Sequence, residues 1–194
     1  MADAVGMIEV EGVAGLIVGA DAAAKAAAVE LLGWESIGGF TTLFLRGTAG
    51  DVDTALVAGV DAAREVVDHV VSATMHQPQP ETLNFVGSPL PEGDDESRAL
   101  ALGMVETRGY GSHVTTNDAM IKTAHVRIAN VLTVHNRVVC TVVTGSVDDV
   151  EQAIATARQA LGDSEWLMGV AVISQPLAEV VRAFAHTNAV AGAS

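Results

Sequence analysis

The sequence contains few aromatic residues, few basic residues and a single cysteine. Aromatic residues make up 4% of the 194 positions although 49% are hydrophobic, so small aliphatic side chains such as Ala and Val must form most of the core. Ten Lys and Arg residues against 24 Asp and Glu residues give a net charge of −14, and this argues against a nucleic-acid partner because phosphates would be repelled. The single Cys140 excludes an intrachain disulfide framework and fits a reducing compartment.

Long apolar runs are also missing. No stretch of the sequence approaches the roughly 20 apolar residues that are needed to span a bilayer. The first residues, Met-Ala-Asp, lack the basic and apolar regions of a signal peptide. We therefore expect a cytoplasmic protein that makes no contact with a membrane.

What the sequence does contain is an internal repeat. Residues 4–12 (AVGMIEVEG) return as residues 101–109 (ALGMVETRG), and the match continues in register through Lys25 and Lys122. After one inserted residue in the second half, Gln77-Pro78 matches Gln175-Pro176. Two copies of one domain are therefore predicted, and such pseudo-symmetry is typical of assemblies. We expect a first domain over 1–80, a Pro-containing acidic linker over 81–97 and a second domain over 98–194.

Each copy predicts the order β-α-β-β-α-β, the split arrangement of ferredoxin-like domains in the α+β class. In the first copy the pattern predicts strands at 5–10, 29–34, 40–45 and 70–75, with helices at 13–28 and 51–67. In the second copy it predicts strands at 102–107, 126–132, 138–144 and 167–173, with helices at 114–124 and 147–161. A further helix is expected at 177–185.

Three motifs resemble the bacterial microcompartment (BMC) shell domain: ALGMVETRG at 101–109, the Asp-Ala-x-x-Lys of 118–122, and VELLGWESIGG at 29–39. The resemblance covers about residues 4–78 and 101–176, so the chain resembles a tandem-domain shell protein. It implies a homotrimer that places six domains around one axis as a pseudo-hexameric tile. Such tiles are expected to join other BMC shell proteins edge to edge around enzymes, while small metabolites cross a central pore.

By the same resemblance, the loop between the second and third strands of each copy lines the pore. In the first copy these residues are Ser36, Ile37, Gly38 and Gly39. In the second copy they are Thr133, Val134, His135, Asn136 and Arg137. The glycines permit close approach of the backbone to the axis. Three copies each of His135 and Arg137 would form a positive constriction that favours anionic or polar solutes, unless both side chains pair with carboxylates on the rim.

The resemblance also assigns four residues to the edge of the tile: Lys25, Lys122, Gln77 and Gln175. The two lysines lie late in an apolar helix, where a simple solvated lysine is the alternative. Family members commonly carry an arginine before the proline that follows the last strand, whereas both copies here carry glutamine. An amide can form hydrogen bonds but brings no charge, so we expect a chemically altered edge.

We expect no cofactor, no metal and no enzymatic activity. Some tandem shell proteins hold an iron–sulfur cluster through one cysteine per subunit, but Cys140 lies in an apolar strand, where a free cysteine is usually a small buried hydrophobe. His135 could bind a metal only if three copies converged. The other histidines lack ligand spacing, and no phosphate-binding loop is present. The alternative function is a ligand-sensing oligomeric module of the same fold.

Overall fold

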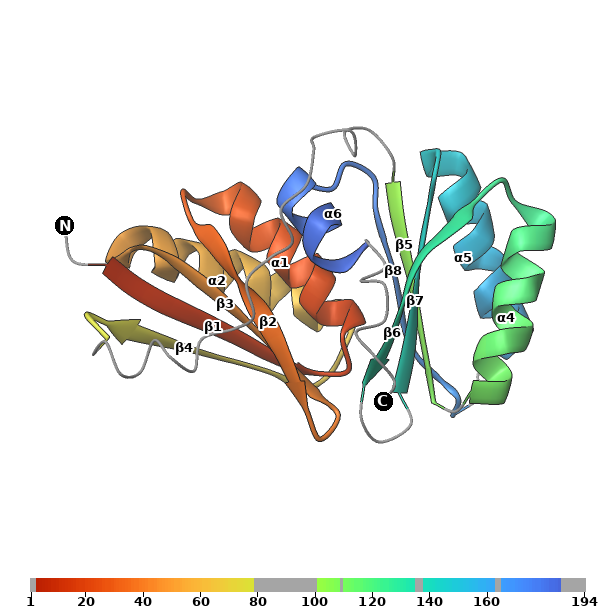
Figure 1. Cartoon of the computed structure of the whole chain (residues 1–194), viewed down its shortest axis with the longest axis horizontal. Coiled ribbons are helices and arrows are strands. Elements are labelled where there is room, and N and C mark those ends of the chain that lie inside the picture. Colours follow the sequence, from red (N-terminus) through yellow and green to blue (C-terminus); the bar gives the residue numbers. More distant parts are fainter. Residues whose placement is uncertain (1–2, 79–100, 109, 135–137, 163–164, 186–194) are drawn as a thin grey trace, which may run out of the picture.

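The computed structural model describes residues 3–78, 101–108, 110–134, 138–162 and 165–185. Its two halves lie side by side along the long axis of the molecule (Figure 1). The predicted linker over 81–97 lies outside the described residues.

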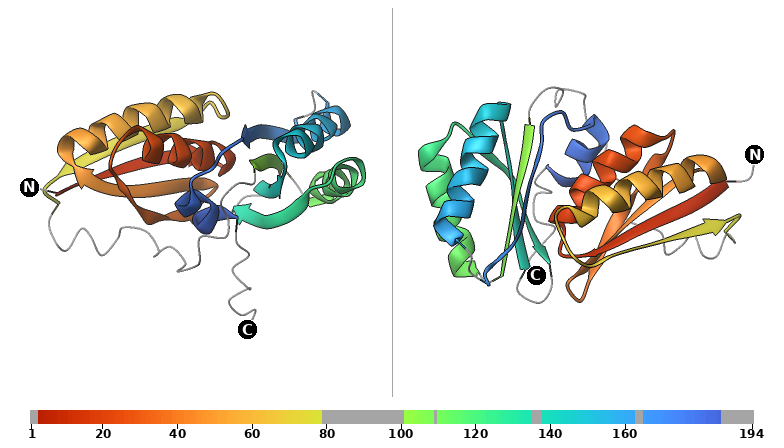
Figure 2. Two further views of the ribbon diagram at one scale, coloured as in Figure 1. Left: turned by 90° about the horizontal axis from the view of Figure 1, so that it is seen from above. Right: turned by 180° about the vertical axis from the view of Figure 1, so that it is seen from behind.

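Each half is a four-stranded antiparallel sheet with two helices on one face (Figures 1 and 2). The first half contains β1 (Asp3–Glu11), α1 (Ala14–Ala26), β2 (Glu30–Ile37), β3 (Phe40–Thr48), α2 (Ala49–Arg64) and β4 (Val70–His76). The second half contains β5 (Ala101–Arg108), α4 (Tyr110–Thr123), β6 (Arg127–Val134), β7 (Val138–Gly145), α5 (Val147–Leu161) and β8 (Leu167–Ile173). A last helix, α6 (Ala178–Phe184), lies between the two halves.

The strand order is β2-β3-β1-β4 in the first sheet and β6-β7-β5-β8 in the second. This is the ferredoxin-like order that the repeat predicts, so the α+β fold class is confirmed. The loops between β2 and β3 and between β6 and β7 are shorter than the sequence predicts. Strand β2 continues through Ile37 and β6 through Val134, because each pairs with the following strand up to the turn: Ile37 pairs with Phe40, and Val134 with Val138.

The longer helix of each half begins at a hydroxyl cap. Thr48 accepts a hydrogen bond from the Asp51 amide (3.2 Å) at the start of α2, and Ser146 accepts one from the Asp149 amide (3.2 Å) at the start of α5. Both caps satisfy an amide that has no partner within the helix. Helix α1 begins differently: Val13 precedes it and offers no side-chain oxygen.

The second sheet is buried on both faces. Every residue of β5 before Arg108 is buried, as is every residue of β7 before Gly145. Helices α4 and α5 cover one face, while α1 and α6 cover the other, and a continuous apolar core runs from the first half through Met104 and Val142 to Phe184. In β4 of the first sheet only Val70 is buried. The described residues therefore cover the first sheet less completely than the second.

Helix α6 links the halves through its last turn. The ring of its fully buried Phe184 stacks on Trp34 of β2, with centroids 5.6 Å apart. The Trp34 indole N–H donates to the Ala183 carbonyl (3.3 Å), and the Asn130 amide of β6 donates to the Phe184 carbonyl (2.9 Å). Carbonyls at a helix end lack partners within the helix, so one donor from each half satisfies the end of α6.

Replacing Phe184 with alanine should destabilise the fold by about 3–5 kcal/mol, because it removes a large buried ring and leaves a cavity between the halves. The measurement is the free energy of unfolding from urea titrations followed by circular dichroism. Val57→Ala on the exposed surface of α2 is the matched control and should change the free energy by no more than about 0.5 kcal/mol. Equal effects of the two variants would contradict the role of α6.

Candidate functional site

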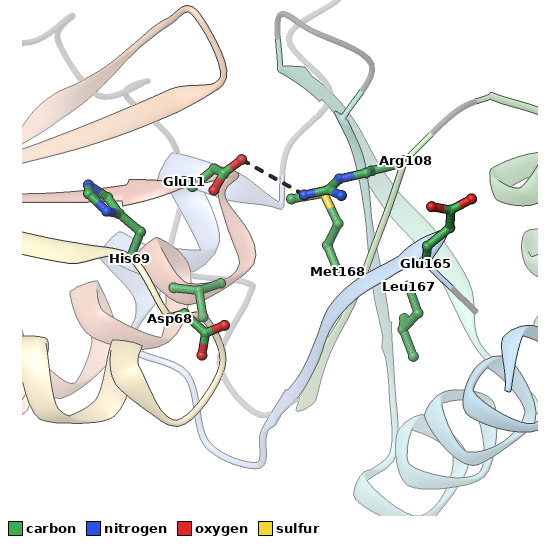
Figure 3. A pocket seen from close by; sticks show the side chains of 8 residues that line it. Glu11, Asp68, His69, Arg108, Glu165, Leu167 and Met168 are labelled. Atoms are coloured by element: carbon green, nitrogen blue, oxygen red, sulfur yellow. Dashed lines mark ion pairs between the residues drawn. The ribbon is translucent and has the colours of Figure 1, made fainter. Parts of the chain in front are cut away.

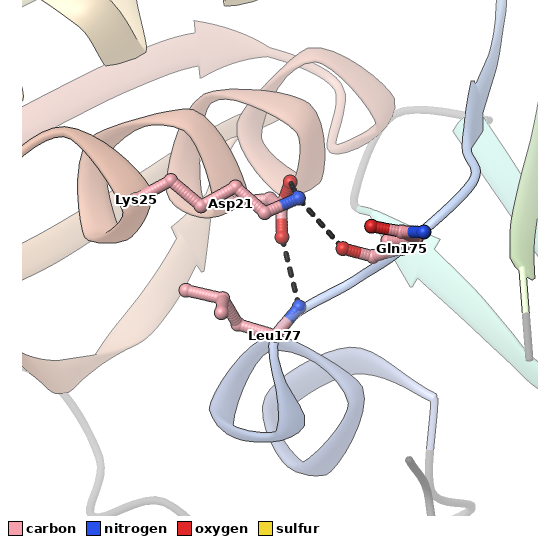
Figure 4. Close-up of polar contacts among 4 residues, drawn as sticks. All are labelled: Asp21, Lys25, Gln175 and Leu177. Carbon is pink, nitrogen blue, oxygen red and sulfur yellow. Dashed lines mark hydrogen bonds and ion pairs between the residues drawn. The ribbon is translucent and has the colours of Figure 1, made fainter. Parts of the chain in front are cut away.

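The junction between the two halves contains both of the acidic residues that are buried among the described residues, Asp21 and Glu106. At one end, the Lys25 ammonium lies 2.6 Å from the Asp21 carboxylate and donates to the Gln175 carbonyl (2.6 Å; Figure 4). The other oxygen of Asp21 accepts the Leu177 amide (2.9 Å). Asp21 is buried, so this charge is compensated by one ion pair and one amide. The α1 helix thereby holds the segment that leads into α6.

At the other end of α1, a glutamate of the second half supplies the missing cap. Oε1 of Glu106 accepts the Val13 amide (2.6 Å) and lies 3.4 Å from the Ala14 amide. A carboxylate is favoured at the positive end of a helix. Gly12, with a φ of +83°, passes so close that a Cβ there would collide with the Glu106 carboxyl group. A glycine is therefore required where the two halves meet.

The Glu106 carboxyl group is fully buried, and no hydrogen-bond partner for its Oε2 is found among the described residues. Burial raises the pKa of Glu106 from 4.5 to about 7; the Val13 and Ala14 amides oppose this rise, and the Glu11 carboxylate adds to it. The carboxyl group therefore changes charge near neutral pH. Cys140 is fully buried, and burial together with the Glu106 charge raises the pKa of its thiol.

A polar cavity of about 320 Å³ opens between the halves close to this cap (Figure 3). Its lining combines one guanidinium, one imidazole and three carboxylates: Arg108, His69, Glu11, Asp68 and Glu165. Arg108 of the second half and Glu11 of the first half face each other at 4.0 Å, and both are about half exposed. Within the described residues, no group of three or more His, Cys, Asp or Glu side chains is arranged to hold a metal.

The four predicted pore residues of the first half form the tip of the β2–β3 hairpin. Gly38 (φ +62°) and Gly39 (φ +93°) make a two-residue turn with positive φ at both positions, which glycine adopts without strain. The Ser36 hydroxyl donates to the Phe40 carbonyl (3.2 Å) across the hairpin. The positive φ values that the glycines were expected to permit are thus present, whereas a close approach of this tip to a neighbour stays a prediction. Whether it lines a pore stays a prediction.

In the second half, Thr133 and Val134 belong to β6, and Thr133 is exposed. The predicted pore residues His135, Asn136 and Arg137 lie outside the described residues. The last residues of β6 and the first residues of β7 lie on the same side of the molecule as the tip of the β2–β3 hairpin (Figures 1 and 2). The assignment of residues 133–137 to the pore stays a prediction.

The four predicted tile-edge residues differ between the halves. Lys25 and Gln175 meet inside the chain, as described above, although the Lys25 side chain remains 42% exposed. Lys122 pairs with Asp118 one turn earlier in α4, and 70% of its side chain is exposed. Gln77 follows β4 with a φ of +51°, a left-handed conformation that is uncommon outside glycine. Contact with a neighbouring tile stays a prediction for all four.

The expectation for Cys140 is confirmed, and a second buried group, His113, has its partners within the second half. Cys140 is a buried strand residue. His113 is a satisfied core histidine, because its ring lies within hydrogen-bond distance of the Thr141 hydroxyl (3.1 Å) and the Asn117 amide (3.0 Å). Glu106 and Asp21 make the buried polar contacts of the junction, and the sequence did not identify either residue as a site. Both lie in the repeated motifs, but a repeat does not reveal which surface of one domain packs against which surface of the other.

We expect Glu106 to make stability depend on pH. Between about pH 4.5 and 7 the unfolded carboxyl group ionises while the folded one stays protonated, so the free energy of unfolding falls as pH rises through this window. The shift corresponds to about 3 kcal/mol. Glu106→Gln cannot ionise, so its stability relative to the unsubstituted chain should rise by about that amount from pH 4.5 to pH 8.

Urea titrations at a fixed protein concentration measure this difference at each pH. Glu151→Gln, at an exposed position of α5, is the matched control and should give a difference that does not change with pH. A flat difference for Glu106→Gln as well would show that Glu106 is not the titrating group.

The chain is similar to known proteins along most of its length. The family model described as "BMC domain" matches residues 4–78 and, a second time, residues 101–176. Carboxysome assembly protein CcmO of Synechococcus elongatus is 30% identical over 187 residues, which cover 93% of this chain and 68% of that protein. Carboxysome shell protein CsoS1 of Prochlorococcus marinus is 46% identical over 74 residues, which cover 38% of this chain and 72% of that protein.

Among solved structures, a microcompartments protein from Desulfitobacterium hafniense DCB is 24% identical, with a TM-score of 0.41 and coverage of 94% of this chain and 99% of that one. No helix of the described residues is both long and apolar enough to cross a membrane.

Proposed function

Because the chain belongs to the BMC domain family and carries one copy of the domain in each half, we propose that it is a structural shell protein of a bacterial microcompartment. In this proposal three chains form a pseudo-hexagonal tile, and small metabolites cross its central pore. The tile joins other shell proteins edge to edge in the shell of a cytoplasmic compartment.

The observation that carries this proposal is the head-to-tail junction between the two halves. The first half contributes α1, and the second half contributes the outer face of its sheet, so two related domains meet through different surfaces. A contact of this heterologous kind leaves one complementary surface unused on each half. Repetition of such a contact generates a closed ring when the rotation permits closure. Three two-domain chains supply the six positions of a hexagon.

The names of the relatives support a structural role. CsoS1 is named as a carboxysome shell protein and CcmO as a carboxysome assembly protein, and the match to CcmO extends over both halves. These names describe shell and assembly proteins rather than enzymes.

The tile can be tested by mass and by microscopy. The chain should sediment at about three times 19.9 kDa and form flat sheets visible by electron microscopy. A monomer or dimer whose stability depends on a small ligand would instead favour the sensor alternative.

Lys122→Glu should abolish sheets while leaving the trimer mass unchanged, because it replaces a cation with a carboxylate at the proposed edge of a tile whose chains each already carry a net charge of −14. Lys122 is the better test position, since Lys25 also holds Gln175 of its own chain. Electron microscopy of the two proteins side by side makes the comparison, with the mass as its internal control. Sheets that resemble those of the unsubstituted protein would refute the edge assignment.

Arg137→Ala should lower the flux of an anionic solute through reconstituted shells several-fold, because it removes a positive charge from each of three loops at the proposed pore. The flux of a neutral solute of similar size is the control and should stay the same. An unchanged anion flux would place Arg137 in an ion pair on the rim, away from the path of the solute.

A further inference from the structure

Helix α4 is attached to the rest of the chain differently from its repeat-related helix α1. The apolar side chains that α1 buries in the core are Ala14, Leu16, Ile17, Ala20 and Ala23. Of the α4 side chains that the structure describes, Met120 alone is both apolar and buried. Helix α4 lies at the outer end of the second half and packs on α5, β5 and β7 (Figure 1). Less apolar burial within the chain therefore holds α4 in place than holds α1.

A polar cluster occupies the core of the second half at a place where the first half is apolar. The cluster consists of His113 and Asn117 of α4 and Thr141 of β7, and His113 and Thr141 are buried. Val105, which pairs with Thr141, belongs to the core beneath the helices, so the cluster faces that core. The corresponding residues of the first half are apolar and fully buried: Leu16, Ala20 and Leu43.

The three side chains of the cluster form a closed ring of hydrogen bonds. The Thr141 hydroxyl donates its one proton to Oδ1 of Asn117 (2.8 Å), so it can only accept at its contact with Nδ1 of His113 (3.1 Å). Nδ1 therefore carries a proton. The side-chain N–H of Asn117 donates to Nε2 of His113 (3.0 Å), so Nε2 is the unprotonated nitrogen. The ring of hydrogen bonds thus requires a neutral imidazole.

Protonation of Nε2 would break this ring. The imidazolium carries two N–H donors, and the second one would face the side-chain N–H of Asn117. Rotation of the Asn117 amide would offer Oδ1 to His113 but withdraw it from Thr141, whose buried hydroxyl would then lose its acceptor. His113 also lies close to the N-terminal end of α4, where the helix dipole disfavours a positive charge. Each effect destabilises the packed position of α4.

We propose that α4 opens as a unit when His113 is protonated, while the two sheets and the other helices stay folded. An open α4 exposes the imidazolium to water, which satisfies both of its N–H donors. The small apolar area that α4 buries makes its release less costly than release of any helix that carries a continuous apolar face. Mild acid therefore acts on this helix before it acts on the rest of the chain.

The elements around the cluster carry their ionisable groups near the surface or on the opposite face of the sheet. On α4 and α5 these groups are Asp118, Lys122, Asp148, Asp149, Glu151 and Arg158. On β5 and β7 they are Glu106, Arg108 and Cys140. Burial lowers the pKa of His113 from its usual 6.5. An open α4 binds the proton at that usual pKa, so the closed form loses stability as the pH falls below about 6.5.

Hydrogen exchange of the full chain, followed by mass spectrometry, tests the opening. The protection factors of the α4 amides should fall about tenfold from pH 7 to pH 5, because the open form binds one more proton, whereas those of α5 should show no such fall. His113→Gln keeps a donor and an acceptor but does not titrate in this range, so the protection of its α4 should not depend on pH. His76→Gln, at an exposed position of β4, is the matched control and should behave as the unsubstituted chain does.

A second variant restores the apolar residues of the first half by combining His113→Leu, Asn117→Ala and Thr141→Leu. It removes the titrating group by a different route, so the test does not depend on the folding of His113→Gln. Its α4 should exchange more slowly than that of the unsubstituted chain at pH 5, and equally at both pH values.

Three outcomes would contradict the proposal. Equal protection of α4 at pH 5 and pH 7 in the unsubstituted chain would overturn the opening itself. A fall of the same size in α1, α2 and α5 would show global unfolding and overturn the separate release of α4. A fall that persists in both variants would overturn His113 as the group that takes up the proton.

Discussion

The contact on which the rest of the structure depends is the one between α1 and the outer face of the second sheet. A four-stranded sheet with helices on one side leaves its second face bare, and β5 and β7 are too apolar on both faces to remain in water. Helices α1 and α6 remove that face from solvent and merge the cores of the two halves. Burial of apolar surface is the dominant favourable term in such an association.

Polar groups determine how the two apolar surfaces fit together. The Glu106 carboxylate reaches the amides that open α1, while Asp21 and Lys25 hold the chain just before α6. A buried carboxyl group costs free energy when it ionises, and the raised pKa of Glu106 expresses that cost. Buried polar groups of this kind can specify one arrangement among several that apolar contact alone would permit. The junction thus combines strong apolar burial with a short set of directional contacts.

The two halves also show how one domain sequence responds to two surroundings. Thr42 donates its hydroxyl to Glu9, whereas the matching position of the second half is Cys140, whose thiol lies in the buried core beside Glu106. Trp34 stacks on Phe184, whereas the matching Val131 is exposed. Fusion of the halves allows such differences, because each copy has its own neighbours. For the same reason, the sequence of the Gly38–Gly39 turn can differ from that of residues 135–137, which occupy the matching place in the second half.

Much of the local structure followed from the sequence itself. Periodicity and the internal repeat predicted each helix and strand of the described residues within a few positions, and they predicted the ferredoxin-like class, because local propensity and apolar spacing act over short distances. Glu106, Asp21 and Lys25 lie in motifs that occur in both halves of the chain, but the repeat could not predict which residues they contact. Glu9 and Glu106 occupy the same position of the same motif, and only one of them is buried against a helix.

That distinction depends on which surfaces of the two copies meet, which is decided by packing between residues about 90 positions apart. Sequence alone determined two domains of one fold, whereas the tertiary structure decided which face each one covers. The physical reason is that local hydrogen bonds and turn preferences are encoded in neighbouring residues, while the fit of two apolar faces depends on the complete shape of both.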